Sequence, residues 1–235
     1  MLFGPRAARY GCASTEFSLH HRACGGGPRD GPCTECRSNM IPAQEALARL
    51  REGNRRFVEN GAAPGGRPGA GQQPFAIVLG CSDSRVPAEL IFGQGFGDLF
   101  VIRVAGNIVA PSQVGSVEFA AERFETRLAV VVGHTQCGAV AATLEELRQP
   151  QGHESPNLRA IVDRIRPAIE PLLATPIAKD PAALAAEATR ANIRASVAHL
   201  RHGSALLERR IERDGLLIVG AEYCVEAGTV EFFDD

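Results

Sequence analysis

GCSDSR (residues 80–85) and GHTQCG (residues 133–138) are the two stretches that decide the fold. Each follows an apolar run, 75–79 before the first and 128–132 before the second. Short aliphatic runs that stop at glycine are typical of parallel strands that are buried on both faces. Two cysteines and a histidine therefore come just after the carboxyl ends of two strands, which is where open α/β sheets bind ligands and metals.

The remainder of the chain alternates strands with helices. Strands are predicted at 75–80, 99–104, 128–132 and 216–221, with a short return strand at 229–233. Helices are predicted from Pro42 onward, near 86–92, and over 114–124, 138–147, 157–173 and 181–213. This alternation predicts an α/β domain, with a mostly parallel central sheet, right-handed crossovers and flanking helices.

Composition narrows the possible partners. The chain has 235 residues, of which 45% are hydrophobic, so it is long enough to bury the core of one α/β domain. The net charge of −2 and the lack of a basic run give no sign of nucleic-acid or membrane-surface binding. No apolar run reaches the length of a membrane span, and we expect a small-molecule substrate.

The first 39 residues differ from the rest, because they are rich in glycine and proline and lack apolar periodicity. We expect 1–39 to be a disordered leader or an upstream extension, with translation starting at Met40, and 40–235 to be the functional domain. The alternative is a small metal or redox site built on the cysteines of this segment, which are Cys12, Cys24, Cys33 and Cys36, with His20 and His21. Their crowding is unlike a disulfide-rich secreted fold, so we expect a reducing, cytoplasmic location.

Cys81, His134 and Cys137 form a candidate metal site. Thiolate and imidazole ligands suit zinc, and three protein ligands leave a fourth position open for water. A lone buried cysteine is more often a core residue, but His134 stands three residues before Cys137, and one turn of chain can direct both to one ion. Cys224 is predicted to be a packing residue and His153 a surface residue. His199 and His202, on the helix predicted over 181–213, are predicted to have no role, because no carboxylate or thiol stands at a matching spacing.

Asp83 has two interpretations at this level. It can cap the helix that follows, because aspartate and serine favour that position ahead of a proline such as Pro87. It can also be a carboxylate beside the metal, held by Arg85 in a bidentate pair that keeps it ionised. Released from Arg85, it could become a fourth ligand and close the open position. The spacing alone does not choose between them.

The two motifs together resemble those of the β-class carbonic anhydrase family, over about residues 42–233. The resemblance implies one Zn²⁺ per chain, held by Cys81, His134 and Cys137, and a catalytic dyad of Asp83 and Arg85. It implies that zinc-bound hydroxide reversibly hydrates CO2 to bicarbonate and a proton. In the same resemblance, the dyad gates and orients the zinc-bound water. It also implies a sheet in strand order 2-1-3-4, completed by the short antiparallel strand.

The same resemblance implies a substrate pocket that is shared across a subunit interface, and hence a homodimer or homotetramer. The positions that carry over to that pocket are Gln72, Phe100, Ala105, Phe119 and Gly138. Two of them depart from the usual pattern, because Ala105 stands where a larger aliphatic residue is common and Phe119 where tyrosine is common. The pocket is therefore expected to be roomier and to lack one hydroxyl donor.

Three other functions remain open on sequence alone. The same fold and metal could hydrolyse CS2 or COS, which are linear and apolar like CO2. A zinc-binding scaffold is a second possibility, although it has no need of both Asp83 and Arg85. A redox protein that uses Cys33 and Cys36 is the third, and it would lose its activity when residues 1–39 are deleted.

Overall fold

The computed structural model describes residues 41–60, 71–149 and 155–233, all of which belong to one compact unit. The predictions for residues 1–39, for Met40 and for His153 lie outside these described residues.

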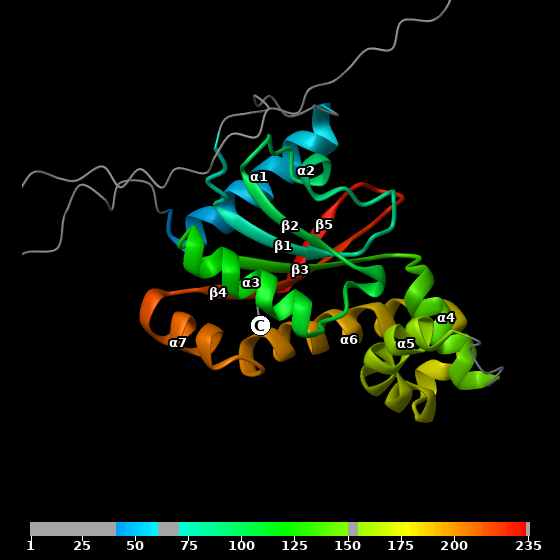
Figure 1. The fold of residues 1–235 in the computed structure, drawn as a ribbon. Coiled ribbons are helices and arrows are strands. Elements are labelled where there is room, and N and C mark those ends of the chain that lie inside the picture. Colours follow the sequence, from blue (N-terminus) through cyan, green and yellow to red (C-terminus); the bar gives the residue numbers. More distant parts are fainter. Residues whose placement is uncertain (1–40, 61–70, 150–154, 234–235) are drawn as a thin grey trace, which may run out of the picture. The chain divides into compact units, whose positions relative to one another are not determined.

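A five-stranded sheet forms the centre of the described unit (Figure 1). The strand order is β2-β1-β3-β4-β5, and the strands are β1 (Ala76–Gly80), β2 (Leu99–Arg103), β3 (Leu128–His134), β4 (Leu217–Tyr223) and β5 (Val230–Phe233). The first four strands pair in parallel, and β5 pairs antiparallel with β4. The predicted order and the predicted return strand are both confirmed.

Burial on both faces explains why the two central strands are aliphatic throughout. Every residue of β1 and of β3 is buried. The parallel register sets Gly80 of β1 against Val132 of β3. The residues just after Gly80 and Val132 therefore leave the same edge of the sheet, which brings the two motifs together.

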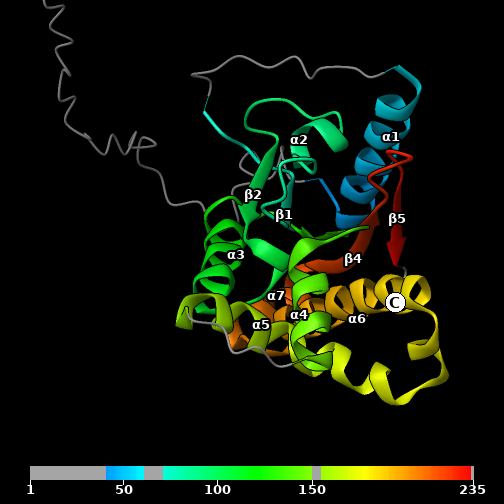
Figure 2. The ribbon, with the colours of Figure 1, turned by 90° about the vertical axis from the view of Figure 1, so that its right-hand side faces the viewer.

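Helices cover both faces of this sheet. They are α1 (Ala43–Asn60), α2 (Ala88–Ile91), α3 (Pro111–Arg123), α4 (Gly138–Arg148), α5 (Pro156–Ile169), α6 (Pro181–His202) and α7 (Ala205–Asp214), with short 3₁₀ turns η2 (Ala105–Asn107), η3 (Glu170–Ala174) and η4 (Pro176–Lys179). Figures 1 and 2 show α1 and α2 on one side of the sheet and α3, α6 and α7 on the other. Two apolar clusters follow this division, one containing Leu50 of α1 and the other Val117 of α3.

The prediction of one helix over 181–213 was wrong, because the chain breaks it into α6 and α7. Gly203 follows the last residue of α6, and Ser204 caps α7 by accepting a hydrogen bond from the Leu207 amide at 3.2 Å. Glycine often follows the last residue of a helix, and serine often caps the N-terminus of the next one. The uninterrupted apolar periodicity on either side concealed this break.

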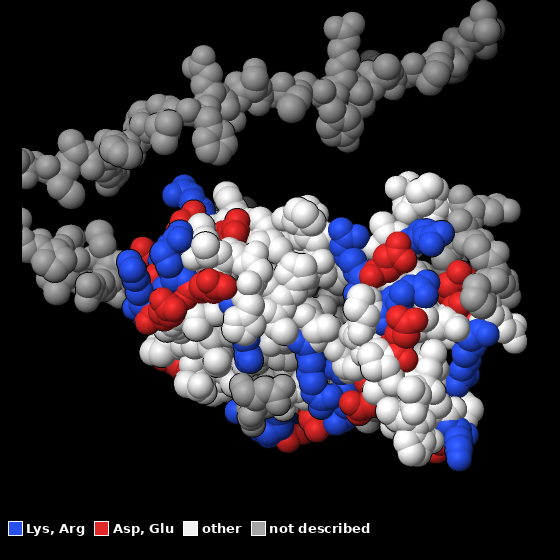
Figure 3. Space-filling view, turned by 90° about the horizontal axis from the view of Figure 1, so that it is seen from below, with Lys and Arg blue, Asp and Glu red and all other residues white. Residues whose placement is uncertain are grey.

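Charged side chains of both signs are interspersed on the surface seen from below (Figure 3). Several ion pairs of the described residues lie within one helix, as between Arg210 and Asp214 of α7 at 3.0 Å. Among the described residues, no helix has the length and apolar character needed to cross a membrane.

Candidate metal centre

Cys81 is placed by the end of β1. It is the first residue after the strand, its side chain is buried, and the backbone amide of Gly106 donates a hydrogen bond to its sulfur at 3.3 Å. An amide that points at sulfur stabilises the thiolate form, which is the form that binds metals. This position thus presents a metal-binding thiolate.

His134 is the last residue of β3, which extends two residues beyond the predicted strand. Its Nδ1 lies 2.9 Å from the carbonyl oxygen of Thr135, so Nδ1 carries the proton and donates it. Nε2 is then left with its lone pair, and this buried atom has no hydrogen-bond partner among the described residues. A histidine that donates one nitrogen to a carbonyl and leaves the other bare is typical of a metal ligand.

Cys137 is positioned by a tight turn and the helix after it. Gln136 has φ +59°, which turns the chain back, and Cys137 is the residue that immediately precedes α4. The amides of Ala139 and Val140, in the first turn of α4, favour the thiolate of Cys137. The helix N-terminus therefore partly offsets the neighbouring Cys81 sulfur and the burial, which together raise the pKa of Cys137.

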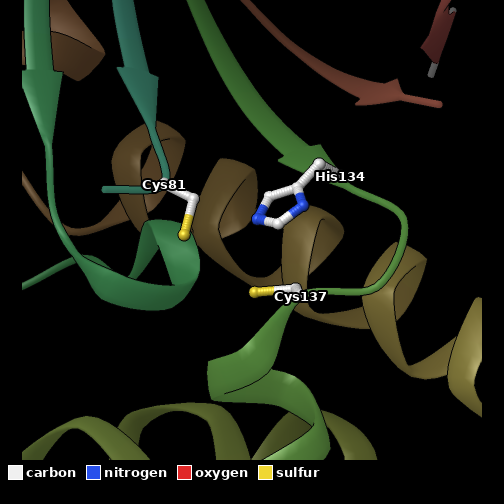
Figure 4. A group of neighbouring side chains, drawn as sticks. All are labelled: Cys81, His134 and Cys137. Carbon is white, nitrogen blue, oxygen red and sulfur yellow. The ribbon is translucent and has the colours of Figure 1, made fainter. Parts of the chain in front are cut away.

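The three side chains converge, as Figure 4 shows. Sγ of Cys81, Sγ of Cys137 and a ring nitrogen of His134 all lie within 4.8 Å of one another, and all three residues are buried. Two soft sulfurs and one imidazole in a site of this size fit zinc and leave one coordination position free. The donor set, together with the bare His134 nitrogen, supports the predicted cofactor.

The two sulfurs interact strongly. Hydrogen bonding between them lowers the pKa of Cys81 and raises that of Cys137, which favours the thiolate of Cys81 and the protonated thiol of Cys137. A metal must displace that proton in order to bind both sulfurs. Metal affinity at this site is therefore expected to fall as the pH falls.

Asp83 and Arg85 meet at the rim of this cluster. Arg85 donates its backbone amide and Nε to Asp83 Oδ1, at 2.9 and 3.0 Å, and its Nη2 to Oδ2 at 2.8 Å. These bonds hold the pKa of Asp83 well below its usual range. Asp83 Oδ2 also lies 3.9 Å from His134 Nε2, the nitrogen that faces the candidate metal position.

The competing interpretation of Asp83 as a helix cap was wrong. The residue that precedes α2 is Pro87, and no side chain caps that helix. Arg103 instead fixes the backbone around Asp83, donating to the carbonyl oxygens of Cys81 at 3.0 Å and Asp83 at 2.6 Å. The GCSDSR loop is thus held from β2 and directs the carboxylate toward the cluster.

Sequence reasoning missed an outer layer of polar contacts. Arg85 Nη1 donates to Gln136 Oε1 at 3.2 Å, and Gln136 in turn donates its amide to Glu226. The Thr135 hydroxyl also donates to Glu226, at 3.1 Å. Glu226 lies ninety residues from Gln136, in the β4–β5 connection, and no local pattern in the sequence signals the contact.

The predicted pocket residues fall into two groups. Ala105 lies next to Gly106, and Gly138 is the first residue of α4, so both adjoin the metal cluster. Phe100 and Phe119 instead lie together, with ring centroids 6.0 Å apart, on the α3 side of the sheet. Gln72 is exposed and precedes β1. Within one chain the structure does not bring the last three to the cluster.

The described cysteine and histidines that were not predicted to bind metal lie outside the metal cluster. Cys224 is half-buried, and its thiol donates to the Glu226 carboxylate at 3.4 Å. His199 and His202 are exposed on α6. Among the described residues, the only group of three or more His, Cys, Asp or Glu side chains close enough to hold a metal is the one already described.

Comparisons with known proteins indicate the family to which this chain belongs. The family model described as carbonic anhydrase matches residues 76–230. "Carbonic anhydrase 2" of Mycobacterium tuberculosis is 36% identical over 207 residues, covering 81% of this chain and 91% of that protein.

Solved structures show the same fold. The β-carbonic anhydrase CafA of Aspergillus fumigatus superposes with a TM-score of 0.63 at 25% identity, covering 81% of this chain and 86% of that one. One of two tetrameric β-carbonic anhydrases of Sordaria macrospora gives a TM-score of 0.63 at 22% identity, covering 82% and 93%. Because the carbonic anhydrase family model matches residues 76–230 and a relative that is 36% identical covers 81% of the chain, this chain belongs to the β-class carbonic anhydrase family.

Proposed function

We propose that this chain catalyses the reversible hydration of CO2 to bicarbonate and a proton, at a zinc ion held by Cys81, His134 and Cys137. The single observation that carries the proposal is the bare, buried Nε2 of His134, which faces two cysteine sulfurs beside an ionised carboxylate. When bound, zinc supplies a Lewis acid that makes water nucleophilic near neutral pH, an effect of which carbonic anhydrase is itself the standard example.

Asp83 supplies the polar group that acts on the reacting water. Because Arg85 keeps it ionised, its oxygens can only accept hydrogen bonds. Oδ2, 3.9 Å from His134 Nε2, is the atom placed to accept a hydrogen bond from that water and so to orient its lone pair toward CO2. Arg85 acts through Asp83, since its three donors fix the direction of the carboxylate.

The same geometry supports a closed state as part of the proposal. If Arg85 released its partner, Asp83 Oδ2 would need to move only a short distance to become a fourth ligand, because it already lies 3.9 Å from His134 Nε2. The Arg85–Gln136 contact favours the open arrangement by holding the guanidinium in place.

We further propose that the enzyme is a homodimer or homotetramer in the cytoplasm. Support for assembly comes from Phe119 of α3, which is exposed and lies against Phe100 of β2. The solved relatives from Sordaria macrospora are described as tetrameric. Support for a reducing compartment comes from the sequence, in which four of the seven cysteines crowd into the first forty residues, unlike the spacing of a disulfide-rich secreted fold.

Stopped-flow CO2 hydration between pH 6.5 and 9 tests the proposed function, with zinc content measured on the same samples. We expect about one zinc per chain and a rate that rises with pH. Full zinc occupancy with no CO2 hydration at any pH, but with turnover of CS2 or COS, would reassign the substrate. A protein without zinc would contradict the proposal altogether.

A further inference from the structure

The 3₁₀ turn η2 contacts one of the metal ligands, Cys81. The amide of Gly106, in the middle of this turn, donates to Cys81 Sγ at 3.3 Å in a buried environment. A hydrogen bond from an amide withdraws charge from a metal-binding sulfur, and such outer contacts tune the affinity and the electronic properties of the metal. The position of this one amide therefore bears on the metal centre.

The turn adopts an unusual conformation to bring that amide to the sulfur. Gly106 has φ +70° and Asn107 has φ +44°, so two successive residues lie in the left-handed region. A side chain at residue 106 would also be too close to its neighbours, because its Cβ would lie 2.8 Å from Ile165 Cδ1 and 3.0 Å from Ala139 Cβ. Such a conformation persists only when surrounding contacts fix it.

Helix α6 supplies these contacts from more than eighty residues away. The side-chain amide of Asn192 donates to the carbonyl oxygen of Gly106 at 2.8 Å. The hydroxyl of Ser196 donates to the carbonyl oxygen of Asn107 at 3.0 Å. Asn192 and Ser196 are one helical turn apart on the same face, and they are only 2% and 5% exposed.

We propose that Asn192 and Ser196 are positioning residues for the metal centre, which hold the η2 turn so that the Gly106 amide stays hydrogen-bonded to the Cys81 sulfur. Both residues act through the backbone of η2, and their hydrogen bonds go to Gly106 and Asn107 and not to the metal ligands. The inference rests on the proposed function only in requiring that the cluster binds a metal. A purely structural role would lower stability and leave the donor strength of the Cys81 sulfur unchanged.

The test uses the full chain loaded with Co²⁺, in which the sulfur-to-cobalt charge-transfer band reports on the thiolates. The variants are Ser196→Ala and Asn192→Leu. The matched control is Thr189→Val, because Thr189 is also buried on α6 but its hydroxyl donates to Ala185 of the same helix, at 3.0 Å. Zinc dissociation constants come from competition with a chelator, and thermal unfolding is recorded for every variant.

We expect the band to move to longer wavelength in both variants, because a sulfur without its hydrogen bond gives up an electron more easily. Zinc affinity should fall about 10- to 100-fold in Asn192→Leu, the usual effect of losing an outer contact, and less in Ser196→Ala. Thr189→Val should keep the wild-type band and affinity even where its unfolding temperature falls.

Variants that fold and keep both the band position and the affinity of the wild type would overturn the inference and leave the proposed function intact. If Asn192→Leu does not fold, the position of the charge-transfer band in Ser196→Ala tests the inference by itself. A wild type that binds neither zinc nor cobalt would overturn the proposed function and this inference with it.

Discussion

Asp83 is held by three donors that all come from one neighbour, the backbone amide, Nε and Nη2 of Arg85. Asp83→Asn replaces one acceptor oxygen of the side chain with a donor. The side chain can then no longer bind Arg85 and also accept a hydrogen bond from water. We expect CO2 hydration to fall about 10²- to 10⁴-fold, the range for loss of a positioned acid or base. Stopped-flow kinetics measures this, together with zinc content, which should stay at the wild-type level.

Asp163→Asn is the matched control for this substitution. Asp163 also faces arginines, at 3.7 Å from Arg159 and 3.8 Å from Arg166, but it lies exposed on α5. Its replacement should leave the rate unchanged. An Asp83→Asn enzyme as active as the wild type would remove Asp83 from the mechanism and leave the zinc site in place.

At the scale of elements, one arginine joins α6 to two strands. Arg190 donates to Glu222 of β4 at 2.9 Å and to Glu231 of β5 at 2.5 Å. Burial raises the pKa of Glu222, whose side chain is only 9% exposed. Arg190→Ala leaves this carboxylate buried without its cation, and we expect a loss of about 3 kcal/mol in the free energy of unfolding at pH 8.

The pH dependence of that loss has a definite sign. A raised pKa means that the folded state binds the proton more tightly than the unfolded chain, so protonation of Glu222 favours folding. The penalty in Arg190→Ala should therefore shrink as the pH falls toward 5, as measured by urea unfolding at both pH values. Glu222→Gln serves as the control and should be close to neutral. An equal loss at pH 5 and pH 8 would show that the lost packing of Arg190, and not the charge of Glu222, sets the effect.

The start of α7 gives a second prediction at this scale. Ser204 accepts from the Leu207 amide at 3.2 Å and donates to Glu118 of α3 at 2.6 Å. Ser204→Ala removes the cap and the link between the helices, and should cost about 1–2 kcal/mol in urea unfolding. Ser116→Ala, which removes a hydroxyl that only bonds back within α3, should change little. Equal effects of the two substitutions would contradict a capping role for Ser204.

These elements also show what the sequence could and could not predict. The buried strands were predictable, because β1 and β3 need aliphatic residues on both faces, and the ligands were predictable because each motif follows such a strand. The break at Gly203 was missed, since apolar periodicity continues across it. The contacts of Gly106 with Asn192 and of Gln136 with Glu226 join residues more than eighty positions apart, and only the folded topology brings them together.

At the scale of the whole molecule, metal binding should contribute to stability. A ligand present at a thousand times its dissociation constant stabilises a protein by about 4 kcal/mol, which for a chain of this size raises the unfolding temperature by roughly 10 °C. We expect removal of zinc by a chelator to lower the unfolding temperature by about that amount. Cys137→Ser should abolish the difference, whereas Cys224→Ser, a cysteine outside the cluster, should retain it. If the chelator does not change the unfolding temperature of the wild type, the three side chains do not hold a metal.

Assembly of the whole molecule is the last expectation, and it follows from the two faces of the sheet. Phe119 is 53% exposed, and Phe100 and Phe124 lie against it on the α3 side. Cys81 and Cys137 belong to the apolar cluster of the opposite side. If Phe100 and Phe119 line a substrate pocket, we expect it to be the pocket of another copy, and the site would then be complete only in an oligomer.

Phe119→Glu places a charge in that exposed aromatic group and should prevent association. We expect a monomer by light scattering, with zinc content and unfolding temperature preserved. If the pocket is shared, CO2 hydration should also fall at least about tenfold, because each site would lose the aromatic wall of a second copy. Phe96→Glu, at an aromatic residue that is 66% exposed in the α2–β2 connection, is the control and should change neither mass nor rate. A monomeric Phe119→Glu protein with full activity would show that one chain holds a complete site, and the shared pocket would then be wrong even though the zinc site stands.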